Sequence, residues 1–170
     1  MRKVSTNRLA TAGLMAALVV VGTMLVQVPT PGKGYIHIGD SMVYLSGIFL
    51  GPLLGALAAA CGSLLADLFS GYGIYAPASF IIKGLDAWMV GFLYLRFVRP
   101  GDSITKKVVS FVIAVLFGGT IMVAGYLAYE TMLYGFPTAA VSIVANVTQA
   151  VGGGILAIPL LLALDRFIIK

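Results

Sequence analysis

Long apolar stretches, separated by short polar segments, follow one another along the whole chain. We expect helices over residues 7–28, 41–50, 53–69, 78–98, 108–133 and 138–167, and breaks where proline and glycine cluster. A helix needs about 20 residues to cross the hydrocarbon core of a bilayer. Residues 41–50 would reach only about 15 Å, or half of that core. The pattern predicts an all-α integral membrane bundle of about six transmembrane helices, the second of them short.

The composition supports a lipid environment for most of the surface. The chain has 170 residues, 60% of them hydrophobic and 10% charged, with a mean hydropathy of +1.04. A soluble domain of this length needs a more charged surface, so we interpret residues 1–170 as a single membrane domain. The net charge of +5 does not indicate nucleic-acid binding, because the basic residues stand singly at the ends of apolar runs.

These basic residues predict the orientation of the bundle, since Lys and Arg are retained on the cytoplasmic side of short loops. With a cytoplasmic N-terminus and an even number of crossings, the C-terminus is cytoplasmic as well. The first helix is then a retained span and not a signal peptide. Two of the eleven basic residues, Lys33 and Lys83, lie elsewhere. The cytoplasmic set comprises Arg2, Lys3, Arg8, Arg96, Arg99, Lys106, Lys107, Arg166 and Lys170.

Signatures of catalysis and of metal binding are lacking in the sequence. It contains no HExxH, no phosphate-binding GxxxxGK[ST] and no GxSxG elbow. Cys61 is the single cysteine and stands among small apolar residues, so we expect a buried packing residue without a disulfide or metal partner. We therefore expect neither an enzyme nor a cofactor or metal site.

Six polar residues inside the apolar stretches are the candidates for chemistry, because each is costly in lipid without a partner or a water-filled cavity. Counted from the external loops at helical rise, they lie roughly 5 to 17 Å deep, in the outer half of the bundle. Two pairs share a helix face because their members are three residues apart. We predict one pocket, formed by Asp67, Lys83, Asp86, Glu130, Asn146 and Gln149.

The external loops add aromatic and hydrogen-bonding side chains to this pocket. We expect Tyr35, His37, Tyr72 and Tyr75 to close its entrance, and Tyr126 and Trp88 to supply flat walls. Lys83, Glu130, Asn146 and Gln149 would contact a small, flat ligand, with Asp86 holding Lys83. A structural alternative stays open, in which Lys83 and Asp86 neutralise each other, the amides bridge helices, His37 stabilises a turn and Asp40 caps a helix.

Four segments resemble the substrate-binding S components of energy-coupling factor (ECF) vitamin transporters. They are GYIHIGD at residues 34–40, GPLLGA at 51–56, ADLFSGY at 66–72 and YAPASFIIKG at 75–84. Within the riboflavin-type family the chain is most similar to the branch associated with hydroxymethylpyrimidine and pyridoxine, and riboflavin is the next substrate to consider. The resemblance covers nearly the whole chain.

The resemblance implies a multi-pass protein of a prokaryotic plasma membrane that binds its vitamin beneath the external loops. Such a subunit docks to a transmembrane T component driven by two ATPases. The small-residue pair that serves docking in this family matches Ala12 and Ala16, and Gly13 and Ala17 continue the same face. Packing within the bundle is the alternative role for this pair.

Two other functions stay open at this point. A stand-alone proton-coupled carrier would use Asp67, Asp86 or Glu130 as a titrating group. A structural membrane subunit without a ligand would use every polar residue to tie helices together.

Overall fold

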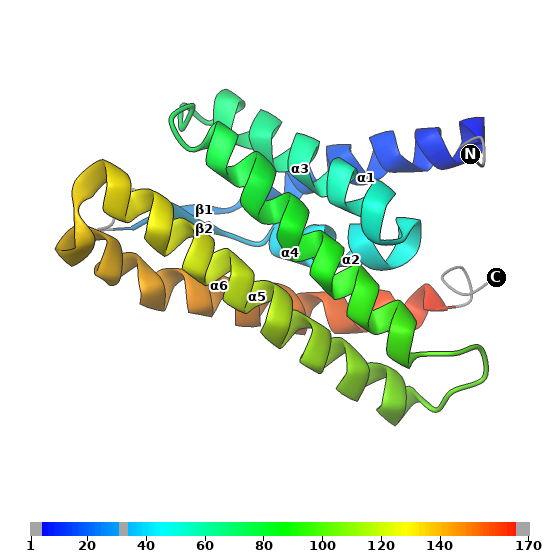
Figure 1. The fold of residues 1–170 in the computed structure, drawn as a ribbon. Helices are drawn as coiled ribbons and strands as arrows, with labels where there is room; N and C mark the ends of the chain where they lie inside the picture. Colours follow the sequence, from blue (N-terminus) through cyan, green and yellow to red (C-terminus); the bar gives the residue numbers. More distant parts are fainter. Residues whose placement is uncertain (1–4, 31–33, 166–170) are drawn as a thin grey trace.

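A computed structural model describes residues 5–30 and 34–165, which form six helices and two short strands (Figure 1). In chain order these elements are α1 (Thr6–Leu25), β1 (Gln27–Pro29), β2 (Tyr35–His37), α2 (Asp40–Leu50), α3 (Pro52–Phe69), α4 (Ala76–Phe97), α5 (Ile104–Tyr134) and α6 (Phe136–Ala163).

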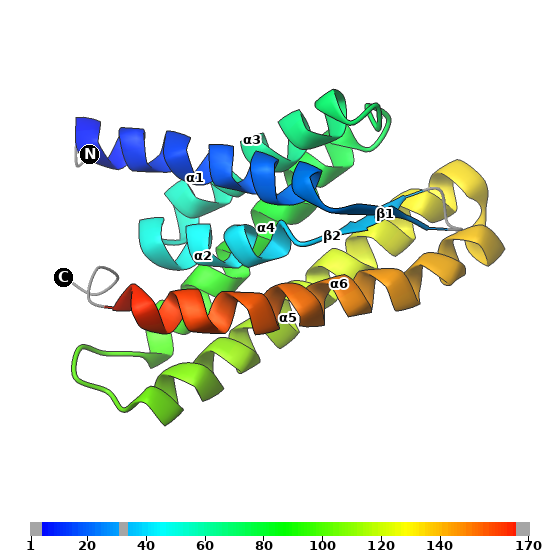
Figure 2. The same ribbon diagram turned by 180° about the vertical axis from the view of Figure 1, so that it is seen from behind.

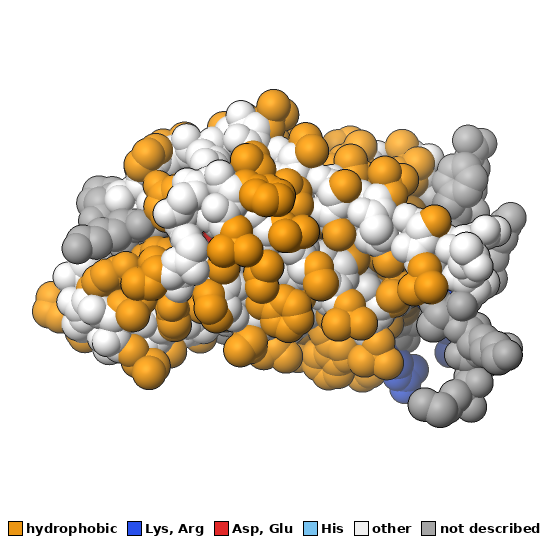
Figure 3. All heavy atoms as spheres, turned by 90° about the horizontal axis from the view of Figure 1, so that it is seen from above, with side chains coloured by type: hydrophobic (Ala, Val, Ile, Leu, Met, Phe, Trp, Pro, Cys, Tyr) orange, Lys and Arg blue, Asp and Glu red, His pale blue; other side chains and the backbone are white. Residues whose placement is uncertain are grey.

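The expected all-α membrane bundle with a short second helix is confirmed. Helices α1, α3, α4, α5 and α6 are long and apolar enough to cross a membrane. Helix α2 has 11 residues, which at helical rise is about half of a bilayer core. Hydrophobic side chains dominate the face shown in Figure 3, as expected of a surface whose solvent is lipid.

A β-hairpin precedes the short helix α2 and extends from its beginning toward the opposite end of the bundle (Figure 2). Strands β1 and β2 pair antiparallel, with Gln27 opposite His37. The apolar pattern predicts only a polar loop here and a first helix that extends to residue 28, but α1 ends at Leu25 because the following residues join the hairpin. The hairpin satisfies backbone groups that a bare loop would leave unpaired inside the bundle.

Local chemistry explains where the helices begin. Helix α5 starts four residues earlier than expected, because the Ser103 hydroxyl accepts a hydrogen bond from the Lys106 amide at 3.3 Å and caps it. Helices α4 and α6 carry Pro77 and Pro137 in their first turns, where proline costs no hydrogen bond. The expected end of the last helix at residue 167 lies outside the described residues.

Close helix crossings hold α2 at the centre of the bundle. A Cβ on Gly47 would collide with the Ala87 carbonyl oxygen of α4, so the two backbones approach as only glycine permits. On the other side, a Cβ on Gly153 of α6 would lie 2.7 Å from the Cβ of Asp40. These contacts fix the first residue of α2, and thus the Asp40 carboxylate, in the bundle interior.

The two ends of the bundle differ in charge. The start of α1 and the end of α6 lie at one end of the ribbon in Figure 1, together with the turn between α2 and α3 and the connection between α4 and α5. Apart from the buried Lys83, the described basic residues belong to segments at this end, where Figure 3 shows Lys and Arg side chains. Arg2, Lys3, Lys33, Arg166 and Lys170 lie outside the described residues. A cytoplasmic location for this end stays a prediction.

The expectation that Cys61 is buried was wrong. Cys61 is exposed on α3, whereas its neighbours Ala60 and Gly62 are buried. Small residues occur on several sides of this helix, so hydropathy alone does not distinguish its inner face.

Candidate ligand-binding site

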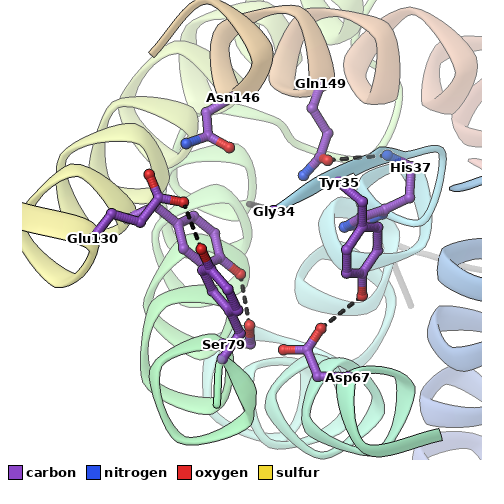
Figure 4. A pocket seen from close by; sticks show the side chains of 10 residues that line it. Gly34, Tyr35, His37, Asp67, Ser79, Glu130, Asn146 and Gln149 are labelled. Carbon is purple, nitrogen blue, oxygen red and sulfur yellow. Dashed lines mark hydrogen bonds between the residues drawn. The ribbon is translucent and has the colours of Figure 1, made fainter. Parts of the chain in front are cut away.

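A polar cavity lies beneath the hairpin, in the half of the bundle that the short α2 does not fill (Figure 4). Its empty volume is about 360 Å³, including the part that opens to the outside. Strand β2 and helices α3, α4, α5 and α6 each contribute to its walls. The lining residues are Gly34, Tyr35, His37, Asp67, Tyr75, Ser79, Tyr126, Glu130, Asn146 and Gln149.

Hydrogen bonds fasten strand β2 to two helices across this cavity. The Tyr35 hydroxyl donates to Asp67 Oδ1 on α3 at 2.6 Å, and the His37 backbone amide donates to Gln149 Oε1 on α6 at 3.1 Å. The strand is therefore a wall of the site and not a free loop above it.

Two buried carboxylates lie on opposite sides of the cavity in Figure 4. Glu130 Oε1 accepts a hydrogen bond from the Tyr75 hydroxyl at 3.3 Å, as Asp67 Oδ1 does from Tyr35. The second oxygens, Asp67 Oδ2 and Glu130 Oε2, have no hydrogen-bond partner among the described residues. Ser79 lies near the Asp67 carboxylate and Ser142 near that of Glu130, but neither serine is within hydrogen-bonding geometry of these second oxygens. Each carboxylate thus keeps an acceptor for a ligand.

The two amides predicted for the pocket have different roles. Gln149 is committed to the protein, since its Nε2 donates to Asp40 Oδ2 at 3.1 Å while its Oε1 accepts from His37. Asn146 lines the cavity one turn earlier on α6 and makes no hydrogen bond with another described residue. Asn146 is therefore available to a ligand as both donor and acceptor.

Lys83 lies outside the cavity wall, contrary to the expectation that it contacts a ligand. It is 1% exposed and forms an ion pair with Asp40, with Met122 Sδ at 2.7 Å from its Nζ. The expectation that Asp86 holds Lys83 was wrong, because the lysine reaches across to α2 instead. Asp40 is likewise not a helix cap, since Gly39 occupies that position and the Asp40 side chain points to Lys83.

His37 contributes a neutral ring to the cavity. Its Nδ1 accepts a hydrogen bond from the Gly39 amide at 3.1 Å, so the histidine also stabilises the turn into α2. Burial lowers the pKa of His37 to about 4, with a smaller opposing effect of Asp40. The ring therefore carries no positive charge at neutral pH.

The aromatic residues divide between the cavity and its surroundings. Tyr35, Tyr75 and Tyr126 line it, as expected. Tyr72 does not line it, but its ring centroid lies 4.5 Å from that of Tyr35. Trp88 is on the outer surface of α4, where it stacks on Phe92, so its prediction as a pocket wall was wrong.

Two lining residues were missed from the sequence. Ser79 Oγ lies 2.8 Å from the Tyr126 hydroxyl, which joins α4 to α5 at the cavity. Ser79 stands one turn before Lys83 on the same helix face, and this position could have indicated a place near the pocket. Gly34 lines the cavity through its backbone, for which sequence offers no chemical signal.

The predicted docking pair on α1 is half-buried. Ala12 and Ala16 pack against the main hydrophobic core, and the Ala16 carbonyl oxygen would be 2.7 Å from a Cβ on Gly62 of α3. Gly13 and Ala17, next to them, are exposed. Packing within the bundle therefore uses one side of this small-residue face and leaves the other open.

Comparison with known proteins identifies what the chain is similar to. Residues 3–166 match the family model described as ECF-type riboflavin transporter, S component. A Pyrococcus woesei protein named "Uncharacterized protein in gap 3'region" is 35% identical over 136 residues, which cover 79% of this chain and 86% of that protein. A solved structure titled "Structure and mechanism of the S component of a bacterial ECF transporter" shares the fold with a TM-score of 0.71. It is 20% identical, and the match covers 96% of this chain and 98% of the other.

Proposed function

The chain belongs to the ECF-type riboflavin transporter S component family, and from this premise we propose that it captures hydroxymethylpyrimidine or pyridoxine for import. Members of this family are S components of vitamin transporters and not enzymes. The resemblance seen in the four sequence segments is thereby confirmed for the family, while the substrate is our proposal.

The balance of donors and acceptors in the cavity carries this proposal. Asp67 and Glu130 each keep one buried oxygen without a partner among the described residues, and Asn146 adds a free amide. The neighbouring cation Lys83 is already paired with Asp40 outside the wall. Because an unsatisfied buried acceptor costs about 1–3 kcal/mol, the best ligand is one that brings several N–H or O–H donors.

Hydroxymethylpyrimidine and pyridoxine meet this demand within a single ring. The first carries an exocyclic amine and a hydroxyl, and the second carries three hydroxyls and a basic ring nitrogen. Every lining residue except Gly34 has a polar side chain, which favours a small hydrogen-bonding ring over the larger three-ring flavin. Anionic vitamins such as pantothenate and folate would face two carboxylates.

A thermal-shift screen of the detergent-purified protein tests the substrate. A ligand that binds only the folded state raises the apparent stability by an amount that grows with its concentration over Kd. We expect a large rise in Tm with hydroxymethylpyrimidine or pyridoxine and none with pantothenate or folate. A rise with riboflavin alone would replace our substrate assignment. No rise with any of these compounds, nor with thiamin, would favour the structural subunit.

Substitutions of Glu130 and Asn146 test whether these residues contact the ligand. Glu130→Gln keeps the shape but weakens a charge-assisted hydrogen bond of about 1.5–3 kcal/mol, so we expect affinity to fall roughly 10- to 100-fold. Asn146→Ala should lower it several-fold. Thr148→Ala is a matched control on the same helix, because Thr148 is exposed and its hydroxyl donates to the Val144 carbonyl oxygen. Unchanged affinity in both pocket variants would contradict the site.

Energy for import would come from partners. The family implies a T component and ATPases, and the sequence lacks the phosphate-binding motif of an ATPase. We infer that uptake in a reconstituted system requires these partners, and that the basic end of the bundle faces the cytoplasm. Uptake driven by a pH gradient without them would favour the proton-coupled carrier.

Helix α1 is our candidate for the docking element. Its face of Ala12 and Ala16, continued by the exposed Gly13 and Ala17, lets another helix approach closely. Gly13→Leu should weaken co-purification with the T component without lowering ligand affinity, since a Cβ there would meet nothing within 4 Å. Val21→Leu, at an exposed position of the same helix, is the control.

A further inference from the structure

Asp86 is a buried acid that the proposed ligand site does not use. It is 0% exposed in the middle of α4, and neither of its carboxylate oxygens has a hydrogen-bond partner among the described residues. Its Oδ1 lies against the backbone of Gly118 on α5, where a Cβ would collide with it. Gly118 therefore makes room for this carboxyl group but gives it no donor.

The charged and titratable groups that face Asp86 come from two helices. Lys83 is three residues earlier on α4, so the two side chains share a face of that helix. Asp40 and Tyr44 of α2 also interact with it electrostatically. The Tyr44 hydroxyl donates to the Ala150 carbonyl oxygen at 3.3 Å, and the Lys83 ammonium is paired with Asp40. Asp86 therefore competes with Asp40 for one cation.

Charge balance decides the state of this cluster. If both acids were ionised, two carboxylates and one ammonium would be buried in the bundle, and an uncompensated buried charge costs several kcal/mol. We propose that Asp86 is a proton-binding site, which holds a proton while Lys83 pairs with Asp40 and provides a second position for the Lys83 ammonium.

The exchange between the two positions conserves charge. When Lys83 turns to Asp86, the proton leaves the Asp86 carboxyl and one proton joins Asp40, so the cluster keeps one ammonium, one carboxylate and one neutral acid. Gln149 connects this cluster to the ligand cavity, because it lines the cavity and donates to Asp40 Oδ2 at 3.1 Å. The position of Lys83 is thus linked to the cavity wall through Asp40 and Gln149.

Infrared difference spectroscopy of the purified, ligand-free protein tests the proton directly. We expect the carbonyl-stretch band of a protonated carboxyl in the wild type minus Asp86→Asn difference at neutral pH. In an Asp40→Asn background Asp86 is the remaining partner of Lys83 and is ionised, so the same subtraction should lose this band. Absence of the band in the first difference, or its persistence in the second, would overturn the proposal.

Thermal unfolding gives a second test that needs no ligand. Asn is a neutral mimic of the protonated acid, so Asp86→Asn should fold with an unchanged Tm. Asp40→Asn should lower Tm modestly, because Lys83 can still pair with the Asp86 carboxylate. The double variant leaves Lys83 without a carboxylate and should lower Tm by more than the sum of the single shifts. Additive shifts, or failure of Asp86→Asn to fold, would contradict a proton on Asp86.

Discussion

Replacing Lys83 by methionine should be among the most destabilising single changes in this protein. Lys83 and Asp40 are 1% and 0% exposed. The substitution therefore leaves the Asp40 carboxylate buried, and among the described residues Gln149 is the side chain that still donates a hydrogen bond to it. Breaking a buried ion pair on one side costs about 3–5 kcal/mol. For a chain of this length, each kcal/mol corresponds to about 2–4 °C in Tm, so we expect a fall of roughly 6–20 °C.

The measurement is thermal unfolding in detergent, followed by intrinsic fluorescence. Lys106→Met is the matched control, because Lys106 and Asp102 form a 2.8 Å pair that is 48% and 20% exposed and should contribute little. Adding Asp40→Asn to Lys83→Met should restore part of the loss, since the unpaired charge is then gone. A Lys83→Met protein that melts no lower than Lys106→Met would refute the buried-pair reasoning.

Three further predictions concern packing, pH and exposure. Gly47→Ala should cost about 1–3 kcal/mol in chemical or thermal unfolding, because its Cβ collides with the Ala87 carbonyl, and wild-type stability would contradict the close crossing. Folding lowers the pKa of His37 from 6.5 to about 4. The contribution of the neutral ring to the free energy of unfolding is therefore fully present above pH 6.5 and is lost as the pH falls toward 4. Thermal unfolding of the wild type and of His37→Gln between pH 6.5 and 4 checks this, because the wild type should lose more stability over that range than the variant. Cys61 is exposed, so a hydrophobic maleimide should label the folded protein, and labelling only after unfolding would refute its placement.

The polar pocket could be predicted from the sequence because charged residues inside apolar stretches are costly and need a common cavity. Glu130, Asn146 and Gln149 do line one cavity with Tyr35, His37 and Tyr75. The partner of Lys83 could not be predicted in this way. Spacing along α4 favoured Asp86, whereas the lysine pairs with an acid 43 residues away in the chain.

The sequence by itself determined the membrane environment, the apolar stretches that form the long helices and four of the six polar residues predicted for the pocket, because hydropathy and proline-glycine breaks are local properties of the chain. Only the tertiary structure decided which acceptors stay open, because that depends on contacts between distant segments. The short α2 places Asp40 beside Lys83, while the hairpin above it occupies one oxygen of Asp67 through Tyr35. Helix register and close backbone crossings set these contacts, and neither is written in the apolar pattern of any one helix.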